Sequence, residues 1–93
     1  MAIGAYFHPA SLSKEQYDEC MRRLNQAGAA TPSGRLFHSA FEEDGRIAVY
    51  DVWDSQASLD TFFQTLGPIM QELGVDPGQP SIAEMHNMIW GQR

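Results

Sequence analysis

His38 and Asp51 are the two side chains in this sequence best placed to act together in chemistry. They lie in strand-like runs on either side of Asp44-Gly45, a dipeptide that tolerates the positive φ angles of a two-residue type I′ turn. Counting outward from that turn sets His38 directly opposite Asp51 on one face of the predicted hairpin. The same register pairs Glu43 with Arg46, Phe41 with Ala48, and Ser39 with Tyr50.

A carboxylate beside an imidazole can orient the ring so that its other nitrogen acts as a general base. We therefore predict that His38 is a catalytic base and that Asp51 orients it. The alternative is a structural cross-strand hydrogen bond that satisfies two polar groups, and buried polar pairs are often of that kind. The sequence leaves both interpretations open.

Four further side chains are predicted to line a substrate pocket beside this pair: Trp53, Phe62, Phe63 and His86. Val49, Asp51 and Trp53 alternate along one strand and therefore point to the same side, where the two apolar residues indicate a buried wall. Phe62 and Phe63 lie on the apolar face of the second predicted helix. His86 joins the pocket if its face of the last strand turns toward the helices. The alternative for His86 is a single hydrogen-bonded core histidine.

Metal binding is not expected. The histidines His8, His38 and His86, with Asp51 and Glu84, offer ordinary ligand atoms, but they lie on different predicted strands without a short-spaced histidine pair. The chain also lacks a Gly-rich phosphate loop and a nucleophile elbow. We therefore expect no metal and no cofactor.

Four strands and two helices must position these residues. Short apolar or alternating runs predict strands over residues 2–8, 35–42, 46–53 and 81–90. Apolar residues at helical spacing predict a first helix that follows Ser13 and ends near Gly28. They predict a second helix that follows Ser55 and ends at Gly74, with a kink or restart at Gly67-Pro68 because proline removes a backbone donor.

Length and charge limit the classes of partner. The 93 residues suffice for one core, so residues 1–93 are predicted to form a single domain. Six Lys and Arg against twelve Asp and Glu give a formal charge of −6, so nucleic acid and membrane surfaces are not expected as partners. Cys20 is the only cysteine, and it falls in the apolar stripe of the first helix. A lone thiol favours a reducing compartment, and we expect a cytoplasmic protein.

The order strand, helix, strand, strand, helix, strand is typical of a ferredoxin-like α+β domain. Such a domain has an antiparallel four-stranded sheet with both helices on one face. The strands nevertheless carry apolar residues on both sides, such as Phe41 and Tyr50 on one side and Val49 and Trp53 on the other. Both faces therefore need burial. The sheet of a second copy is the simplest cover, so we predict a homodimer in the form of a dimeric α+β barrel.

Three segments resemble a known group of proteins. They are Val49-Tyr50-Asp51-Val52-Trp53-Asp54-Ser55 running into an amphipathic helix, Leu66-Gly67-Pro68 within that helix, and the closing His86-Asn87-Met88-Ile89. Together they resemble the dimeric α+β barrel proteins, and in particular their antibiotic-biosynthesis monooxygenase-like branch. The resemblance covers nearly the whole chain, and its most specific part is Trp53-Asp54-Ser55.

This resemblance implies the fold more strongly than it implies an activity. The superfamily includes cofactor-free monooxygenases that act on polycyclic phenols, lactone isomerases and haem-dependent enzymes, with ligands usually held between sheet and helices. Its larger haem-binding members have longer chains, so the resemblance implies no haem for this sequence.

Two kinds of function follow. In the first, the protein binds a small apolar or aromatic molecule between sheet and helices and performs cofactor-independent monooxygenase or isomerase chemistry at His38 and Asp51. In the second, it is a non-catalytic ligand-binding or structural dimer. An open pocket with unpaired His38 nitrogens favours ligand binding or catalysis, and a filled core with both His38 and His86 hydrogen-bonded favours a structural role.

Overall fold

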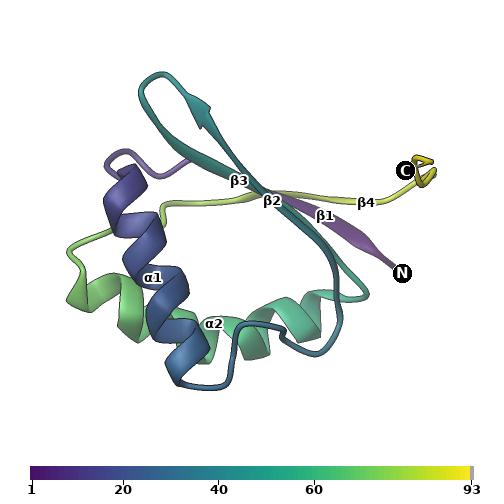
Figure 1. Ribbon diagram of the computed structural model, residues 1–93. Coiled ribbons are helices and arrows are strands. Elements are labelled where there is room, and N and C mark those ends of the chain that lie inside the picture. Colours follow the sequence, from purple (N-terminus) through teal and green to yellow (C-terminus); the bar gives the residue numbers. More distant parts are fainter. Residues whose placement is uncertain (93) are drawn as a thin grey trace.

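The computed structural model describes residues 1–92 and contains six elements in the predicted order (Figure 1). The strands are β1 (Ile3–Phe7), β2 (Arg35–Glu43), β3 (Arg46–Trp53) and β4 (Ser81–Glu84), and the helices are α1 (Lys14–Gln26) and α2 (Gln56–Glu72). The strands form one antiparallel sheet in the order β2-β3-β1-β4. The predicted ferredoxin-like α+β fold is therefore confirmed.

Both helices begin at serine caps, as predicted. Ser13 forms a complete capping box, because its hydroxyl accepts from the backbone N–H of Gln16 at 3.1 Å while its own N–H donates to the Gln16 side chain at 2.9 Å. The Ser55 hydroxyl accepts from the backbone N–H of Ser58 at 3.2 Å. These caps determine the residue at which each helix begins.

Pro68 does not interrupt α2. The helix runs continuously from Gln56 to Glu72, so a restart at this proline is ruled out. Phe62 before the proline and Met70 after it are both buried against the core. Because tertiary packing supplies most of a helix's stability, this burial offsets the one backbone hydrogen bond that proline removes.

The β2–β3 hairpin has the predicted turn and register. Asp44 and Gly45 have φ angles of 55° and 78°, as a type I′ turn requires. The predicted pairs are all present: Glu43 with Arg46, Phe41 with Ala48, Ser39 with Tyr50, and His38 with Asp51. A register shift between Arg35 and Phe37 marks a bulge near the start of β2.

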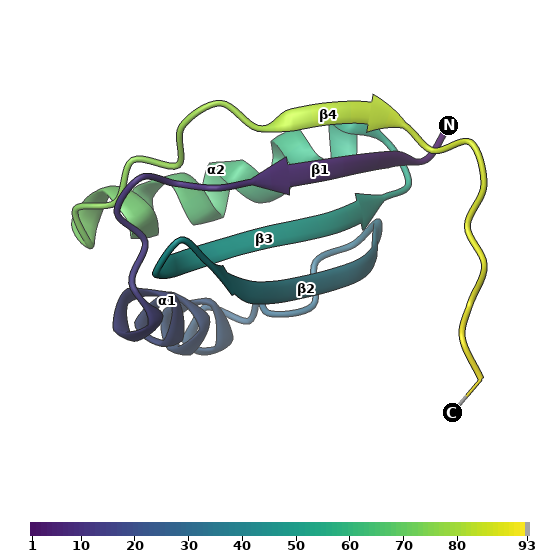
Figure 2. The same ribbon diagram turned by 90° about the horizontal axis from the view of Figure 1, so that it is seen from above.

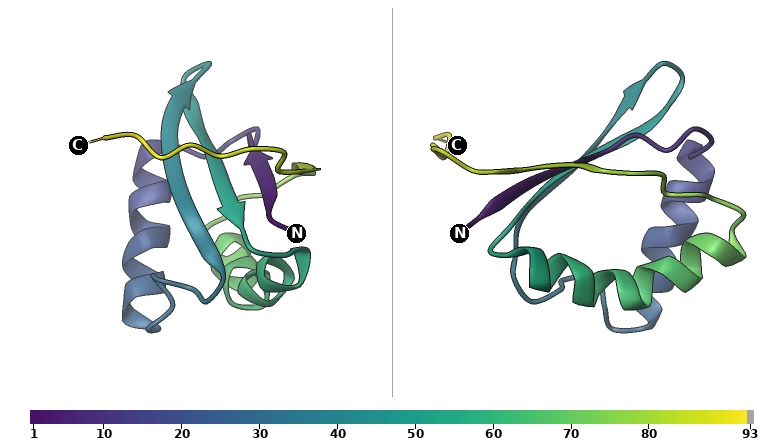
Figure 3. Two further views of the ribbon diagram at one scale, coloured as in Figure 1. Left: turned by 90° about the vertical axis from the view of Figure 1, so that its right-hand side faces the viewer. Right: turned by 180° about the vertical axis from the view of Figure 1, so that it is seen from behind.

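Both helices pack on one face of the sheet (Figures 1 and 3). The core on this face consists of the buried apolar residues Ile3, Ala5, Phe7, Leu12, Cys20, Leu24, Ile47, Trp53, Leu59, Phe62, Met70 and Val75. Asp51 alternates with Val49 and Trp53 along β3, so it faces the helices too, and His38 opposite it shares that face. Neither described helix is long and apolar enough to cross a membrane.

The other face of the sheet is not covered by any described segment (Figure 2). Phe37 and Phe41 lie on it with 44% and 43% of their surface exposed. These two aromatic side chains form exposed apolar surface on the face away from the helices.

The predicted strand over residues 81–90 is wrong in its length, because β4 ends at Glu84. Glu84 pairs with Ile3, the first residue of β1, and the Met85 N–H donates to the Ala2 carbonyl at 2.9 Å. Beyond that point the segment has no neighbouring strand in the described chain. Residues 85–92 extend away from the sheet (Figures 1 and 2). Ile89 and Trp90 in this segment are 84% and 64% exposed.

Candidate functional site

His38 and Asp51 meet in the structure as the hairpin register predicts. The His38 Nδ1 atom lies 2.6 Å from Asp51 Oδ1. Ala5 of β1 pairs with Asp51 on the other side of β3. The Asp51 side chain is 6% exposed and that of His38 is 22% exposed. Because an ionised carboxylate can only accept, the Nδ1–H of His38 donates to it.

Tyr17 of α1 is a third member of this group. Its hydroxyl oxygen lies 2.7 Å from His38 Nε2, and the planes of the two rings are within 3° of each other. With Nδ1 protonated, Nε2 of the neutral imidazole is an acceptor, so the Tyr17 O–H donates to it. Burial raises the pKa of the Tyr17 phenol, Arg35 opposes this, and Asp51 adds to it. Both nitrogens of His38 are therefore paired.

The sequence analysis missed Tyr17 because its spacing from Cys20, Met21 and Leu24 is that of an apolar helix face. The available clue was its hydroxyl group. A tyrosine on a buried face usually needs a hydrogen-bond partner, and the apolar spacing of the helix does not identify that partner.

A cavity of about 60 Å³ lies between the sheet and the helices, with this triad in its wall. Its apolar wall includes Phe7, Leu12, Met21, Val49, Phe63 and Leu66. Typical small-molecule sites measure roughly 300 Å³ or more. The cavity as it stands therefore has room for a few water molecules or one compact ligand, and a polycyclic ligand would require the helices to move.

Arg35 brings a positive charge to the same cavity wall. Its guanidinium carbon lies 5.7 Å from the centroid of the Phe62 ring, and its Nη2 donates to the Ala30 carbonyl at 3.0 Å. No carboxylate within the described residues forms an ion pair with Arg35. The charge is thus available to compensate an anion inside the cavity.

The structure brings two of the four predicted pocket residues to the cavity. Phe62 and Phe63 line it. Trp53 lies behind the wall, with no exposed surface and its ring centroid 5.4 Å from that of Phe62. Its Nε1 is the one buried side-chain nitrogen or oxygen in residues 1–92 without a hydrogen-bond partner.

His86 does not reach this cavity within one chain. It is exposed just beyond β4, beside a shallow hollow that also involves Gly4, Tyr50 and Met85. The expectation that it shares a pocket with His38 depended on a longer last strand, and β4 stops two residues before it.

Cys20 also lines the cavity, but its thiol is not activated as a nucleophile. It is a free, buried thiol whose pKa is raised by burial, an effect that Arg23 partly opposes. A thiol in such surroundings stays protonated and unreactive at neutral pH, which agrees with its assignment to the apolar stripe.

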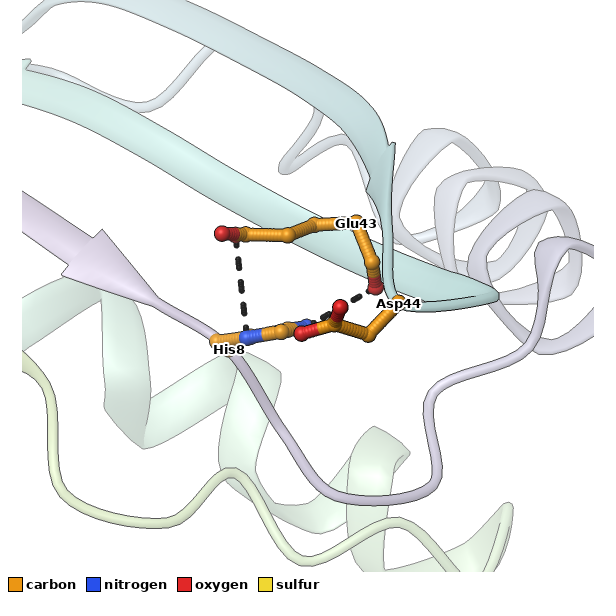
Figure 4. A group of neighbouring side chains, drawn as sticks. All are labelled: His8, Glu43 and Asp44. Carbon is orange, nitrogen blue, oxygen red and sulfur yellow. Dashed lines mark hydrogen bonds and ion pairs between the residues drawn. The ribbon is translucent and has the colours of Figure 1, made fainter.

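His8, Glu43 and Asp44 form the one group of three potential metal ligands in the described part of the chain, with ligand atoms within 4.8 Å of one another (Figure 4). The His8 Nε2 atom lies 3.1 Å from the Glu43 carbonyl oxygen, and Nδ1 lies 3.7 Å from Glu43 Oε1. Tyr6 also donates to the Glu43 carboxylate. These contacts join the hairpin turn to the end of β1.

Comparison with known proteins gives matches in structure alone. No family model matches the chain, and no curated protein matches its sequence. A candidate antibiotic biosynthesis monooxygenase from Chloroflexus aurantiacus J-10-fl shares 15% identity over 97% of this chain and 98% of its own, with a TM-score of 0.68. Another from Deinococcus radiodurans shares 16% identity over 100% of both chains, with a TM-score of 0.61.

SnoaB, a cofactor-independent oxygenase from Streptomyces nogalater, shares 14% identity in a mutant form. The match covers 95% of this chain and 94% of SnoaB, with a TM-score of 0.60. At such identities a structural likeness establishes the fold and leaves activity open. The resemblance drawn from the sequence is thereby confirmed at the level of the fold.

Proposed function

We propose, from the fold that this chain shares with antibiotic-biosynthesis monooxygenase-like proteins, that it binds a compact apolar or aromatic molecule between sheet and helices and removes a proton from it without a cofactor. The observation that carries this proposal is the His38–Asp51 pair, joined at 2.6 Å in the wall of an otherwise apolar cavity. An imidazole oriented by a carboxylate is suited to proton transfer near neutral pH.

Proton removal from a phenol, or from a carbon next to a carbonyl, leaves an electron-rich anion. If the anion reacts with dioxygen, the protein acts as a monooxygenase. If the anion takes the proton back at another carbon, the protein acts as an isomerase. The shared fold of SnoaB, named a cofactor-independent oxygenase, supports the first outcome. The size of the cavity favours a single ring over a polycyclic ligand.

The proposal includes a homodimer. Phe37 and Phe41 expose large apolar surfaces on the sheet face away from the helices, and a second copy of that face would bury them. Ile89 and Trp90 lie on a segment that extends beyond its own sheet (Figure 2), where a second subunit would also supply their contacts.

Ligand binding can be tested with single-ring phenols by calorimetry and by protein-observed NMR. We expect chemical-shift changes at Tyr17, His38 and Phe63, and we expect Leu66→Phe, which fills the cavity, to weaken binding at least tenfold. Leu36→Phe is the matched control, because Leu36 is 46% exposed and does not line the cavity. An equal loss of binding affinity in both variants, or no binding by the wild type, would contradict a ligand site in this cavity.

Catalysis is tested with the phenols that bind, by following oxygen consumption and product formation in the absence of added cofactor. His38→Ala should lower kcat by about 10²–10⁴-fold if the pair takes part in proton transfer. The dimer and the fold of the variant are checked in parallel by light scattering and circular dichroism. Unchanged turnover in a folded variant would remove His38 from the mechanism.

A non-catalytic dimer is the second candidate, and two observations favour it. Both His38 nitrogens are already hydrogen-bonded, and the cavity is small. In that case the triad would join α1 to the sheet, and phenols would bind without turnover or fail to bind.

A further inference from the structure

We infer that Tyr17, rather than His38, is the group that exchanges a proton with the ligand, and that His38 and Asp51 act through it as a relay. The inference rests on the proposed function and names the atom that touches the ligand. Its starting point is that His38 has no free nitrogen, because Nδ1 faces Asp51 at 2.6 Å and Nε2 faces the Tyr17 hydroxyl at 2.7 Å.

Tyr17 has the capacity that His38 lacks. A phenol oxygen has one proton to donate and two lone pairs with which to accept. The proton is directed to His38 Nε2, and no other described residue forms a hydrogen bond with this hydroxyl. The lone pairs can therefore accept a hydrogen bond from a ligand in the cavity that Tyr17 lines.

The proposed step balances without an oxidant or reductant. The ligand's acidic proton moves to the Tyr17 oxygen as the Tyr17 proton moves to His38 Nε2. The electron pair of the broken bond stays on the ligand, which becomes an anion. Tyr17 ends neutral, and the imidazolium formed at His38 is balanced by the Asp51 carboxylate. The reverse sequence returns a proton to the ligand.

One feature of the site suits an anionic product. Arg35 lies in the same cavity wall, and no described carboxylate pairs with it. The ligand anion would thus form beside a cation. The Asp51 carboxylate, which also borders the cavity, lies at the opposite edge of the imidazole from the Tyr17 hydroxyl.

The test uses para-nitrophenol as the probe, since its anion absorbs visible light and its neutral form does not. The probe is added to excess protein at about one unit below its own pKa, and binding is measured separately by calorimetry. We expect wild-type protein to bind the probe as its anion. Tyr17→Phe should bind the probe but lower the ionised fraction at least tenfold. Asp51→Asn, which keeps the side-chain shape, should lower it similarly.

Tyr50→Phe is the matched control, because it also removes one phenol hydroxyl. Tyr50 belongs to the opposite sheet face, and its hydroxyl contacts the Met85 sulfur at 3.5 Å. The probe bound to the Tyr50→Phe variant should remain ionised. If Tyr17→Phe binds the probe with the wild-type ionised fraction, Tyr17 is not the proton acceptor, although the proposed ligand site stands. If the wild type does not bind the probe by calorimetry, both proposals are overturned.

A second measurement needs no ligand. The relay requires neutral His38 to carry its proton on Nδ1, so the nitrogen NMR shifts of the imidazole should identify Nε2 as the unprotonated atom. Tyr17→Phe should shift the Nε2 resonance and leave that of His86, which is exposed, unchanged. A proton on Nε2 of the neutral ring would overturn the relay even if the phenol site is real.

Discussion

Tyr17, His38 and Asp51 come from three different elements, and each hydrogen bond between them fixes the role of the next. The Asp51 carboxylate accepts from Nδ1, which makes Nε2 an acceptor and the Tyr17 hydroxyl a donor. The directions of both hydrogen bonds thus follow from the buried negative charge of Asp51. The same arrangement explains why Tyr17 should stay protonated in the folded protein.

A pH dependence of stability follows at this scale. Burial raises the pKa of Tyr17 above its unfolded value of about 10, so the folded state holds this proton more tightly than the unfolded chain. The contribution of Tyr17 is complete below pH 10 and is lost as pH rises through its folded pKa. The free energy of unfolding of the wild type should therefore fall more steeply than that of Tyr17→Phe above about pH 10, by at most about 1.4 kcal/mol per pH unit.

Urea unfolding of both proteins between about pH 8 and pH 11 checks this prediction. The pKa of Tyr6 is also raised, chiefly by its hydrogen bond to Glu43, but Tyr6 is present in both proteins and cancels in the comparison. Parallel pH profiles would show that Tyr17 titrates as it does in the unfolded chain.

At the scale of the elements, the loop before β2 packs closely against the junction between β3 and α2. Gly34 has a φ of 89°, and its carbonyl accepts from the Asp54 N–H at 2.8 Å, which joins the start of β2 to the end of β3. A Cβ atom at this position would clash with Ser58 and Asp54 at the beginning of α2. Glycine is needed here both for its backbone angle and for its lack of a side chain.

Gly34→Ala should therefore destabilise the fold by about 2–4 kcal/mol, from left-handed strain together with overpacking. Gly28→Ala is the matched control, because Gly28 has a similar φ of 71° and a Cβ there would meet nothing within 4 Å. Gly28→Ala should lower the free energy of unfolding by about 1–2 kcal/mol, from backbone strain alone. Chemical denaturation of both variants measures the difference, and equal losses would show that the clash is relieved by small shifts of Ser58.

At the scale of the whole molecule, the sheet has one face packed under two helices and one face open (Figure 3). The open face carries Phe37 and Phe41, and the segment after β4 extends past the sheet edge. The fold leaves apolar surface that one chain cannot bury, which is the physical basis for the proposed dimer.

Phe41→Glu should convert a dimer into a monomer, because it places a charge on the exposed apolar surface of the proposed interface. Gln71→Glu adds the same charge on an exposed position of α2 and should leave the dimer intact. Light scattering coupled to size-exclusion chromatography gives the mass of each. A wild-type protein with the mass of one chain would contradict the dimer, and so would a Phe41→Glu variant that keeps the wild-type mass.

The cytoplasmic location and the single domain stay predictions. They rest on composition, on the lone Cys20 and on chain length.

The features that depend on neighbours along the chain could be predicted from the amino-acid order. Asp44-Gly45 fixed the turn, the turn fixed the register, and the register placed His38 against Asp51. Ser13 and Ser55 fixed the helix starts through bonds to residues three positions away.

Features that depend on contacts between distant elements could not be predicted in this way. Tyr17 meets His38 because of the angle at which α1 packs on the sheet, and apolar spacing along a helix does not encode that angle. His86 lies outside the cavity because β4 ends at Glu84, where its neighbour β1 begins. The alternation of residues in the sequence continues past Glu84 and therefore does not show where the strand ends. The volume of the cavity also depends on how side chains from five elements pack together, which no single segment specifies.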